Sequence, residues 1–280
     1  MPASKPRPKA EDEGVAEHYR GGGEIDRLDR PRGRLEWERT QELALRYLPP
    51  PPAVVADIGG GPGRYALWLA GLGYRVEHRD LMAEHVQQLT KALDGPAQTL
   101  VATAQADARD LADLPDASVD AVLLLGPLYH LRRRPDRLQA LAEAARIAKP
   151  GGVVLAAAIS RWSARLDAYI GQKLYEAFPE TAASLPSIER TGWIPRLMPG
   201  GFTAYAHRPR QLWAEVRSAG LIPEVLVGVE GVGYLLADLE ERLESPTHRQ
   251  MLLDSARALE AVPELLGVSP HLLVVARTPA

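Results

Sequence analysis

The sequence predicts an α/β fold, in which a doubly wound, mostly parallel sheet carries helices on both of its faces. Short runs rich in aliphatic and β-branched residues alternate with longer runs of helical periodicity, which is the pattern of strand–helix–strand units. Residues 122–125 and 153–155 are continuously apolar, as strands buried on both faces should be. We therefore expect strands at 54–58, 74–78, 99–105, 119–125, 153–159, 221–229 and 271–276. We expect helices at 34–48, 64–72, 83–93, 135–148, 234–243 and 247–261.

Some segments precede the alternation of strands and helices, and others interrupt it. Residues 1–14 are rich in proline and charge and nearly free of apolar side chains, which predicts a disordered tail. Residues 15–52 contain one helical pattern and end in four prolines, so we expect an N-terminal helical lid segment. Residues 53–280 are expected to form a single domain, in which 160–215 and 233–267 are lid or insertion elements.

Composition excludes several classes of protein. The 280 residues contain no cysteine, which excludes a Cys-based zinc site, an iron–sulfur cluster and a thiol nucleophile. The balance of 33 basic against 36 acidic residues argues against a nucleic-acid partner. No apolar run reaches the roughly 18 residues that a membrane span needs, and the first 13 residues lack the apolar core of a secretory signal. We expect a cytoplasmic protein with no membrane partner and no metal, and no feature predicts an oligomeric state.

The strongest local signal is the glycine-rich run 57–63 (DIGGGPG), which lies between the first strand and the first helix after it. Glycines there allow a sharp turn and close approach of a ligand to the backbone. Alone, the run fits an ordinary tight turn or several kinds of nucleotide site. Asp57 would repel a phosphate and favour a cationic ligand. Asp80 ends the second strand, where a carboxylate typically accepts hydrogen bonds from two ribose hydroxyls, or caps the next helix.

These residues resemble the motifs of the class I, Rossmann-like, S-adenosylmethionine-dependent methyltransferases. Five segments are similar to that family's motifs and follow in the family's order, at 57–63, 74–81, 105–109, 120–130 and 149–152. The resemblance implies a seven-stranded sheet of order 3-2-1-4-5-7-6 with strand 7 antiparallel, and S-adenosylmethionine as the cofactor. It also implies a set of cofactor-binding positions, namely Asp57, Gly59, Gly61, Gly63, Asp80, Leu81, Asp107, Ala108 and Gly126.

The N-terminal segment offers two further cofactor-binding candidates. In several families of this class an N-terminal tyrosine and helix fold over the cofactor, which implies that Tyr19 closes the site and that Arg39 meets the methionine carboxylate. The alternative for Arg39 is a solvated pattern of charges on one helix face.

Methyl transfer needs alignment above all, and a general base only where the acceptor must lose a proton. His130 is the first candidate base, because it follows the fourth strand, where ligands bind in open α/β sheets. Tyr129 could orient the acceptor or contact the sulfonium through cation–π attraction. His207 in the expected lid is the second candidate, and Glu230 could hold an acceptor amine. The alternatives are local packing for Tyr129 and His130, and a merely solvated His207.

The leading hypothesis is in-line transfer of a methyl group to an O, N or activated C nucleophile of a small molecule, including natural-product tailoring. The expected wall of the acceptor pocket is aromatic and consists of Trp162, Trp193, Phe202 and Tyr205. A peptide or protein methyltransferase and a non-catalytic binding module remain alternatives. An aminopropyl transferase is disfavoured because 126–130 lacks acidic residues, and an NAD-dependent oxidoreductase because Pro62 and Asp57 suit pyrophosphate poorly.

Overall fold

The computed structural model describes residues 27–280 except 96, 198–200 and 202. The expected tail 1–14, Tyr19 and Phe202 lie outside the described residues. The strands are β1 (Val54–Ile58), β2 (Arg75–Asp80), β3 (Val101–Gln105), β4 (Val119–Leu124), β5 (Ala148–Ser160), β6 (Trp193–Ile194), β7 (Ala204–His207), β8 (Ile222–Gly228) and β9 (His271–Arg277).

Helices follow most of the strands. The longer ones are α2 (Pro31–Tyr47), α3 (Arg64–Gly71), α4 (Ala83–Ala92), α7 (Arg134–Ile147), α10 (Thr181–Thr191), α11 (Pro209–Ser218) and α13 (Pro246–Leu259). The short ones are η1 (Arg27–Asp29), α5 (Ala97–Leu100), α6 (Pro127–His130), α8 (Ser163–Leu166), η2 (Asp167–Gly171), α9 (Leu174–Ala177), η3 (Gly231–Leu235), α12 (Leu239–Glu244) and η4 (Leu266–Val268). In the part of the chain that the structure describes, no helix is long and apolar enough to cross a bilayer.

The central sheet has the predicted order. Its strands lie in the sequence β3-β2-β1-β4-β5-β9-β8, where β8 and β9 are the sixth and seventh of the expected strands. Neighbours from β3 to β5 pair in parallel, whereas β9 is antiparallel to both β5 and β8. The carboxyl ends of β1, β4, β5 and β8 therefore share one edge of the sheet with the first residue of β9.

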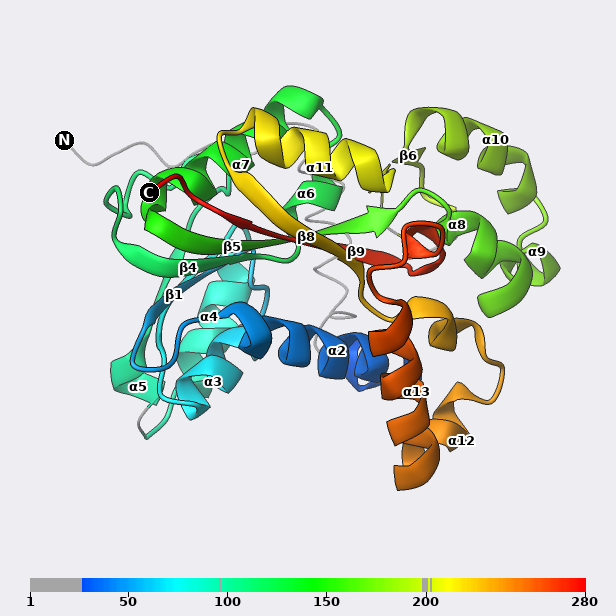
Figure 1. Cartoon of the computed structure of the whole chain (residues 1–280), viewed down its shortest axis with the longest axis horizontal. Helices are drawn as coiled ribbons and strands as arrows, with labels where there is room; N and C mark the ends of the chain where they lie inside the picture. The colour runs from blue at the N-terminus through cyan, green and yellow to red at the C-terminus, as the bar shows by residue number, and fades with distance from the viewer. Residues whose placement is uncertain (1–26, 96, 198–200, 202) are drawn as a thin grey trace.

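Two apolar clusters hold the helices on opposite faces of the sheet. On one face α2 and α3 contribute Leu43 and Leu69, both fully buried against the strands. On the other face α7 and α11 contribute Leu141 and Leu212 to a second cluster. Figure 1 shows α2, α3 and α4 below the sheet and α7 and α11 above it. The predicted doubly wound architecture is thus confirmed.

The stretch 160–215 differs from its prediction as a helical lid, because it also adds strands. After α8 to α10, β7 pairs in parallel with the last two residues of β5, beyond the point where β4 ends, and β6 pairs with β7. All four residues of β7 are buried. Four residues are too few to show a strand periodicity, which is why the sequence did not reveal this addition.

Helix α2 is fixed to the rest of the chain along its whole length. Leu35 packs with Tyr234 and Leu253 in a separate cluster formed with η3, α12 and α13. Glu38 accepts a hydrogen bond from Arg249 of α13 at 2.8 Å. The helix therefore bridges the sheet and the excursion after β8.

Candidate active site

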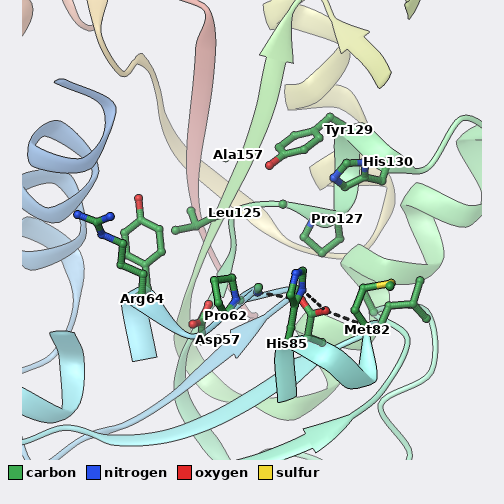
Figure 2. A pocket seen from close by; sticks show the side chains of 18 of the residues that line it. Asp57, Pro62, Arg64, Met82, His85, Leu125, Pro127, Tyr129, His130 and Ala157 are labelled. Carbon is green, nitrogen blue, oxygen red and sulfur yellow. Dashed lines mark hydrogen bonds and ion pairs between the residues drawn. The ribbon is translucent and has the colours of Figure 1, made fainter. Parts of the chain in front are cut away.

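One cavity lies at the carboxyl edge of the sheet. Its lining comes from the glycine-rich turn after β1, the ends of β2 and β4, helix α6, helix α2 and the start of β9. Figure 2 shows Asp57, Pro62 and Met82 on one side of this cavity, and Tyr129 and His130 on the opposite side. Sequence segments that are more than two hundred residues apart thus meet in one site.

The backbone of the glycine turn is held in a single conformation. Gly59 and Gly61 have φ of 68° and 59°, in the left-handed region that favours glycine. The Gly59 N–H donates to the carbonyl of Arg79 at 2.7 Å. A Cβ on Gly60 would lie 2.4 Å from Asp57 Oδ2 and 2.6 Å from the His78 ring, so only glycine fits. The turn therefore presents bare backbone to a ligand.

His78 supports the turn from below, a role that the sequence did not suggest. Its Nε2 lies 3.0 Å from the carbonyl oxygen of Gly61, and its Nδ1 lies 2.8 Å from Thr103 Oγ1. Burial lowers the pKa of His78, with only partial opposition from the charge of Asp80. A neutral imidazole that donates to Gly61 and accepts from Thr103 satisfies both contacts.

Asp80 organises the neighbouring wall. Its Oδ2 accepts from the Gly61 N–H at 2.8 Å, and its Oδ1 accepts from the Met82 N–H at 2.8 Å and lies 3.0 Å from His85 Nδ1. Burial alone would raise the pKa of Asp80, but the hydrogen bonds from His85, Met82 and Gly61 lower it overall. An ionised carboxylate with lone pairs still available beyond these bonds is a good acceptor for ligand hydroxyls.

The pKa of Asp57 is shifted in the opposite direction to that of Asp80. Its side chain is buried, and Oδ2 has no hydrogen-bond partner among the described residues. Burial first and the negative charge of Asp80 second raise the pKa of Asp57 to about 7, although the Ala66 N–H partly offsets them. A ligand with positive charge near this carboxyl would stabilise its ionised form.

The third acidic position also faces the cavity. Asp107 and Ala108 line it after β3, together with Leu81 after β2. Arg109 holds the Asp107 carboxylate through a hydrogen bond from Nε to Oδ1 at 2.9 Å and a contact from Nη2 to Oδ2 at 2.5 Å. The Asp107 side chain is therefore fixed at the end of the cavity away from α6.

Helix α6 brings the two aromatic candidates into the cavity. Gly126, the residue before α6, lines it, and Tyr129 and His130 lie on the same wall with their rings 4.6 Å apart. The preceding strand β4 ends at Leu124, so this short helix starts at the edge where the ligand pocket opens. The prediction that His130 faces the site is consistent with this position.

Three predicted site residues do not line the cavity. Gly63 lies under α4, where a Cβ would meet Leu89 at 2.5 Å, so this glycine permits helix packing. Arg39 is fully buried, and its guanidinium donates to Glu42 at 2.6 Å, to the carbonyl of Val229 at 3.2 Å and to Glu260. These partners correct the expectation that Arg39 meets a cofactor carboxylate.

His207 is the third. It is fully buried on β7, and its Nε2 lies 3.2 Å from Glu215, which in turn binds Arg137 at 2.8 Å. Burial raises the pKa of Glu215, but the hydrogen bonds from Arg137 and His207 outweigh burial and lower the pKa to about 2. This network belongs to the packing of α7 and α11, which corrects the expectation that His207 reaches an acceptor.

The expected aromatic wall is likewise absent from the described part of the cavity. Trp162, Trp193 and Tyr205 do not line it, and the strand β7 that carries Tyr205 pairs with the last two residues of β5. In their place the far wall consists of residues from α2, from β5, from the residue after β8 and from β9, namely Glu36, Thr40, Ala157, Val229, His271 and Leu273. His271 was not among the residues that the sequence indicated. The implied antiparallel strand 7 could have indicated it, because the first residue of that strand must lie at the edge of the sheet where ligands bind.

Comparisons with known proteins agree with this geometry. A family model described as a methyltransferase domain matches residues 56–156. An S-adenosylmethionine-dependent methyltransferase of Methanosarcina mazei is similar with a TM-score of 0.57 at 18% identity, over 85% of this chain and 97% of that one. A Thermotoga maritima protein described as a possible histamine N-methyltransferase gives 0.55 at 19% identity, over 92% and 97%. The Haemonchus contortus phosphoethanolamine N-methyltransferase 2 gives 0.52 at 18% identity, over 87% of this chain and 52% of that one.

Proposed function

We propose that this chain is a class I S-adenosylmethionine-dependent methyltransferase, and that it methylates an O, N or activated C nucleophile of a small molecule. The supporting observation is that one cavity holds both the glycine turn and a second wall made by Ala157, Val229, His271 and Leu273. A flat docking face for a large partner would not need such a wall.

The residues present fit the cofactor. The bare backbone of Gly59 to Gly61 and the ionised Asp80 suit the ribose side, because Asp80 Oδ2 accepts one hydrogen bond from the Gly61 N–H and keeps a second lone pair for a ribose hydroxyl. Asp107 would accept a hydrogen bond from the adenine amino group. Asp57 Oδ2, which has no hydrogen-bond partner among the described residues, suits the positively charged amino group of the cofactor's methionine part. When bound, the cofactor supplies a methyl group on a positively charged sulfur, which leaves as a neutral thioether. The chain has to align the acceptor and exclude water.

Tyr129 and His130 complete the proposed acceptor side. Their wall lies opposite Asp57, so an acceptor between them and the cofactor would be held at the methyl-bearing end of the cavity. The tyrosine ring can attract the sulfonium through its π face. A cytoplasmic location and an acceptor that is neither nucleic acid nor membrane remain part of this proposal, supported by the near-neutral charge balance.

Two measurements test the proposal. Calorimetry with S-adenosylmethionine and its demethylated product should show binding that Asp80→Ala weakens at least 100-fold and that the exposed control His248→Gln leaves unchanged. Transfer of radiolabelled methyl should then be followed with panels of phenols, carboxylic acids, amines, peptides and RNA. Turnover only with peptides or RNA would refute the small-molecule acceptor, and no binding of either cofactor form would refute the whole assignment.

A further inference from the structure

A carboxylate–histidine pair lies at the wall of the cavity formed by the last two strands. Glu230 follows β8 and is 2% exposed, whereas His271 is the first residue of β9 and lines the cavity. Glu230 Oε1 lies 2.5 Å from His271 Nδ1. Glu230 Oε2 accepts from the Ser269 hydroxyl at 2.8 Å and from the His271 N–H at 3.2 Å. The carboxylate is therefore held in place from three directions.

This arrangement assigns the tautomer of the imidazole. A carboxylate only accepts hydrogen bonds, so Nδ1 must carry the proton that it donates to Glu230. The lone pair of the neutral ring is then on Nε2, on the side of the ring away from the carboxylate. A buried carboxylate that fixes the tautomer and ring orientation of a histidine is the arrangement by which a histidine acts as a base.

Further charged groups surround the pair. Glu36 of α2 has Oε2 3.9 Å from His271 Nδ1. Asp167 of η2 forms an ion pair with Arg32 at 3.1 Å. Burial raises the pKa of Asp167, the charge of Arg32 partly opposes this effect, and the charge of Glu230 adds to it. The phenol of Tyr234 on η3 is buried nearby, and burial together with the charges of Asp167 and Glu230 raises its pKa. Among these groups the carboxylates of Glu230, Glu36 and Asp167 outnumber the guanidinium of Arg32, so they stabilise positive charge on the imidazole.

We propose that His271 is the general base of the methyl transfer and that Glu230 is its positioning residue. This inference rests on the proposed function, because it concerns the proton that an acceptor O–H or N–H must lose. As the acceptor lone pair bonds to the methyl carbon, the carbon–sulfur bond breaks and its electron pair stays on sulfur. The acceptor proton passes to Nε2 of His271, and Glu230 and Glu36 balance the resulting imidazolium. The acceptor class is thereby narrowed to one that carries an ionisable O–H or N–H.

The same atoms could in principle hold a metal ion, because one ligand atom each from Glu36, Glu230 and His271 lies within 4.8 Å of the others. The direct contact between Glu230 and Nδ1, and the Ser269 hydroxyl on the second oxygen, favour a proton between them. A metal would have to displace these bonds.

The first experiment reads the tautomer without turnover. Histidine ¹⁵N spectra of the full chain bound to S-adenosylhomocysteine, with His271→Gln for assignment, should show a protonated Nδ1 and an unprotonated Nε2. Glu230→Gln should increase the fraction of the other tautomer, whereas His248→Gln leaves the His271 signals unchanged. A protonated Nε2 in the wild-type neutral ring, or signals that Glu230→Gln does not move, would overturn the proposal.

The second experiment uses whichever acceptor the panel identifies. His271→Gln should lower kcat by about 10²- to 10⁴-fold, the usual contribution of a general base, with little change in the cofactor Kd. Glu230→Gln should move the acid limb of the pH profile to lower pH, because the imidazolium loses its counter-charge. A loss with His130→Gln that His271→Gln does not reproduce would overturn the assignment, as would an activity that EDTA removes and a divalent cation restores. If no acceptor is methylated the proposed function fails, and the ¹⁵N result still decides the tautomer.

Discussion

Replacing Asp57 by asparagine should stabilise the ligand-free protein, and by more as the pH rises. Burial and the charge of Asp80 raise the pKa of this carboxyl from 3.8 to about 7 in the folded chain. Between these values the folded state binds more protons than the unfolded state, so stability falls as pH rises. Three pH units at 1.36 kcal/mol each give about 4 kcal/mol in total. About 2 kcal/mol of this loss falls between pH 5.5 and pH 7.

Urea unfolding of the wild type and Asp57→Asn at pH 5.5 and pH 8 measures this effect. The free energy of unfolding of the variant, relative to wild type, should rise by about 2 kcal/mol between the two values. The comparison isolates the titration of Asp57. The pKa values of Asp80 and Glu215 are lowered, so these groups titrate at lower pH, and they are present in both proteins. A difference between the proteins that does not change with pH would refute the assigned electrostatic state.

The same carboxyl should couple cofactor binding to protonation. A cationic ligand beside Asp57 lowers its pKa, so binding near pH 6 should release close to one proton and binding near pH 9 should release none. Calorimetry in buffers of different ionisation enthalpy measures this number directly. Asp57→Asn should abolish the release, and a release that persists in the variant would place its source elsewhere.

Three further outcomes follow from the site and its supports. Asp80→Ala removes the acceptor for two backbone N–H groups and should weaken cofactor binding at least 100-fold by calorimetry, about 3 kcal/mol; a tenfold loss or less would contradict its role. Gly60→Ala puts a Cβ 2.4 Å from Asp57 and should lower the free energy of unfolding by about 1–3 kcal/mol, and an unchanged value would show that the turn relaxes freely. Arg137→Met leaves Glu215 buried without its cation and should cost about 3–5 kcal/mol. Adding Glu215→Leu should recover most of that loss, and no recovery would refute the ion-pair explanation.

The parts of the fold that depend on local pattern were predictable. The run from β1 through the glycine turn into α3 combines a buried strand, glycines and a helix start within some twenty residues, so its place in the structure follows from its sequence. The resemblance to a known family supplied what local pattern cannot, namely the reversed last pair of strands. β7 was missed because a four-residue strand carries no periodic signal and is stabilised by its contact with the end of β5.

The site divided in the same way. Asp57, Asp80 and Asp107 lie at or just after the carboxyl ends of consecutive strands, and parallel strands bring such positions together by geometry alone. Arg39 and His207 carry the right chemistry for a site, but carboxylates bind their polar atoms, namely Glu260 of a distant segment for Arg39 and the buried Glu215 of the next helix for His207. Both pairings depend on how the elements pack together, which no sequence motif records.

We expect the far wall to determine acceptor specificity in this chain. The segment 160–215 is the longest addition to the core, yet Trp162, Trp193 and Tyr205 do not line the cavity. The cavity is instead completed by α2 and by the junction between β8 and β9, where Glu230 fixes His271. Both elements are bound to each other, because the buried Arg39 of α2 donates to the carbonyl of Val229, next to Glu230. A change in α2 should therefore alter acceptor choice through this junction even where it touches no ligand, which makes Arg39 a structural link between α2 and the proposed base.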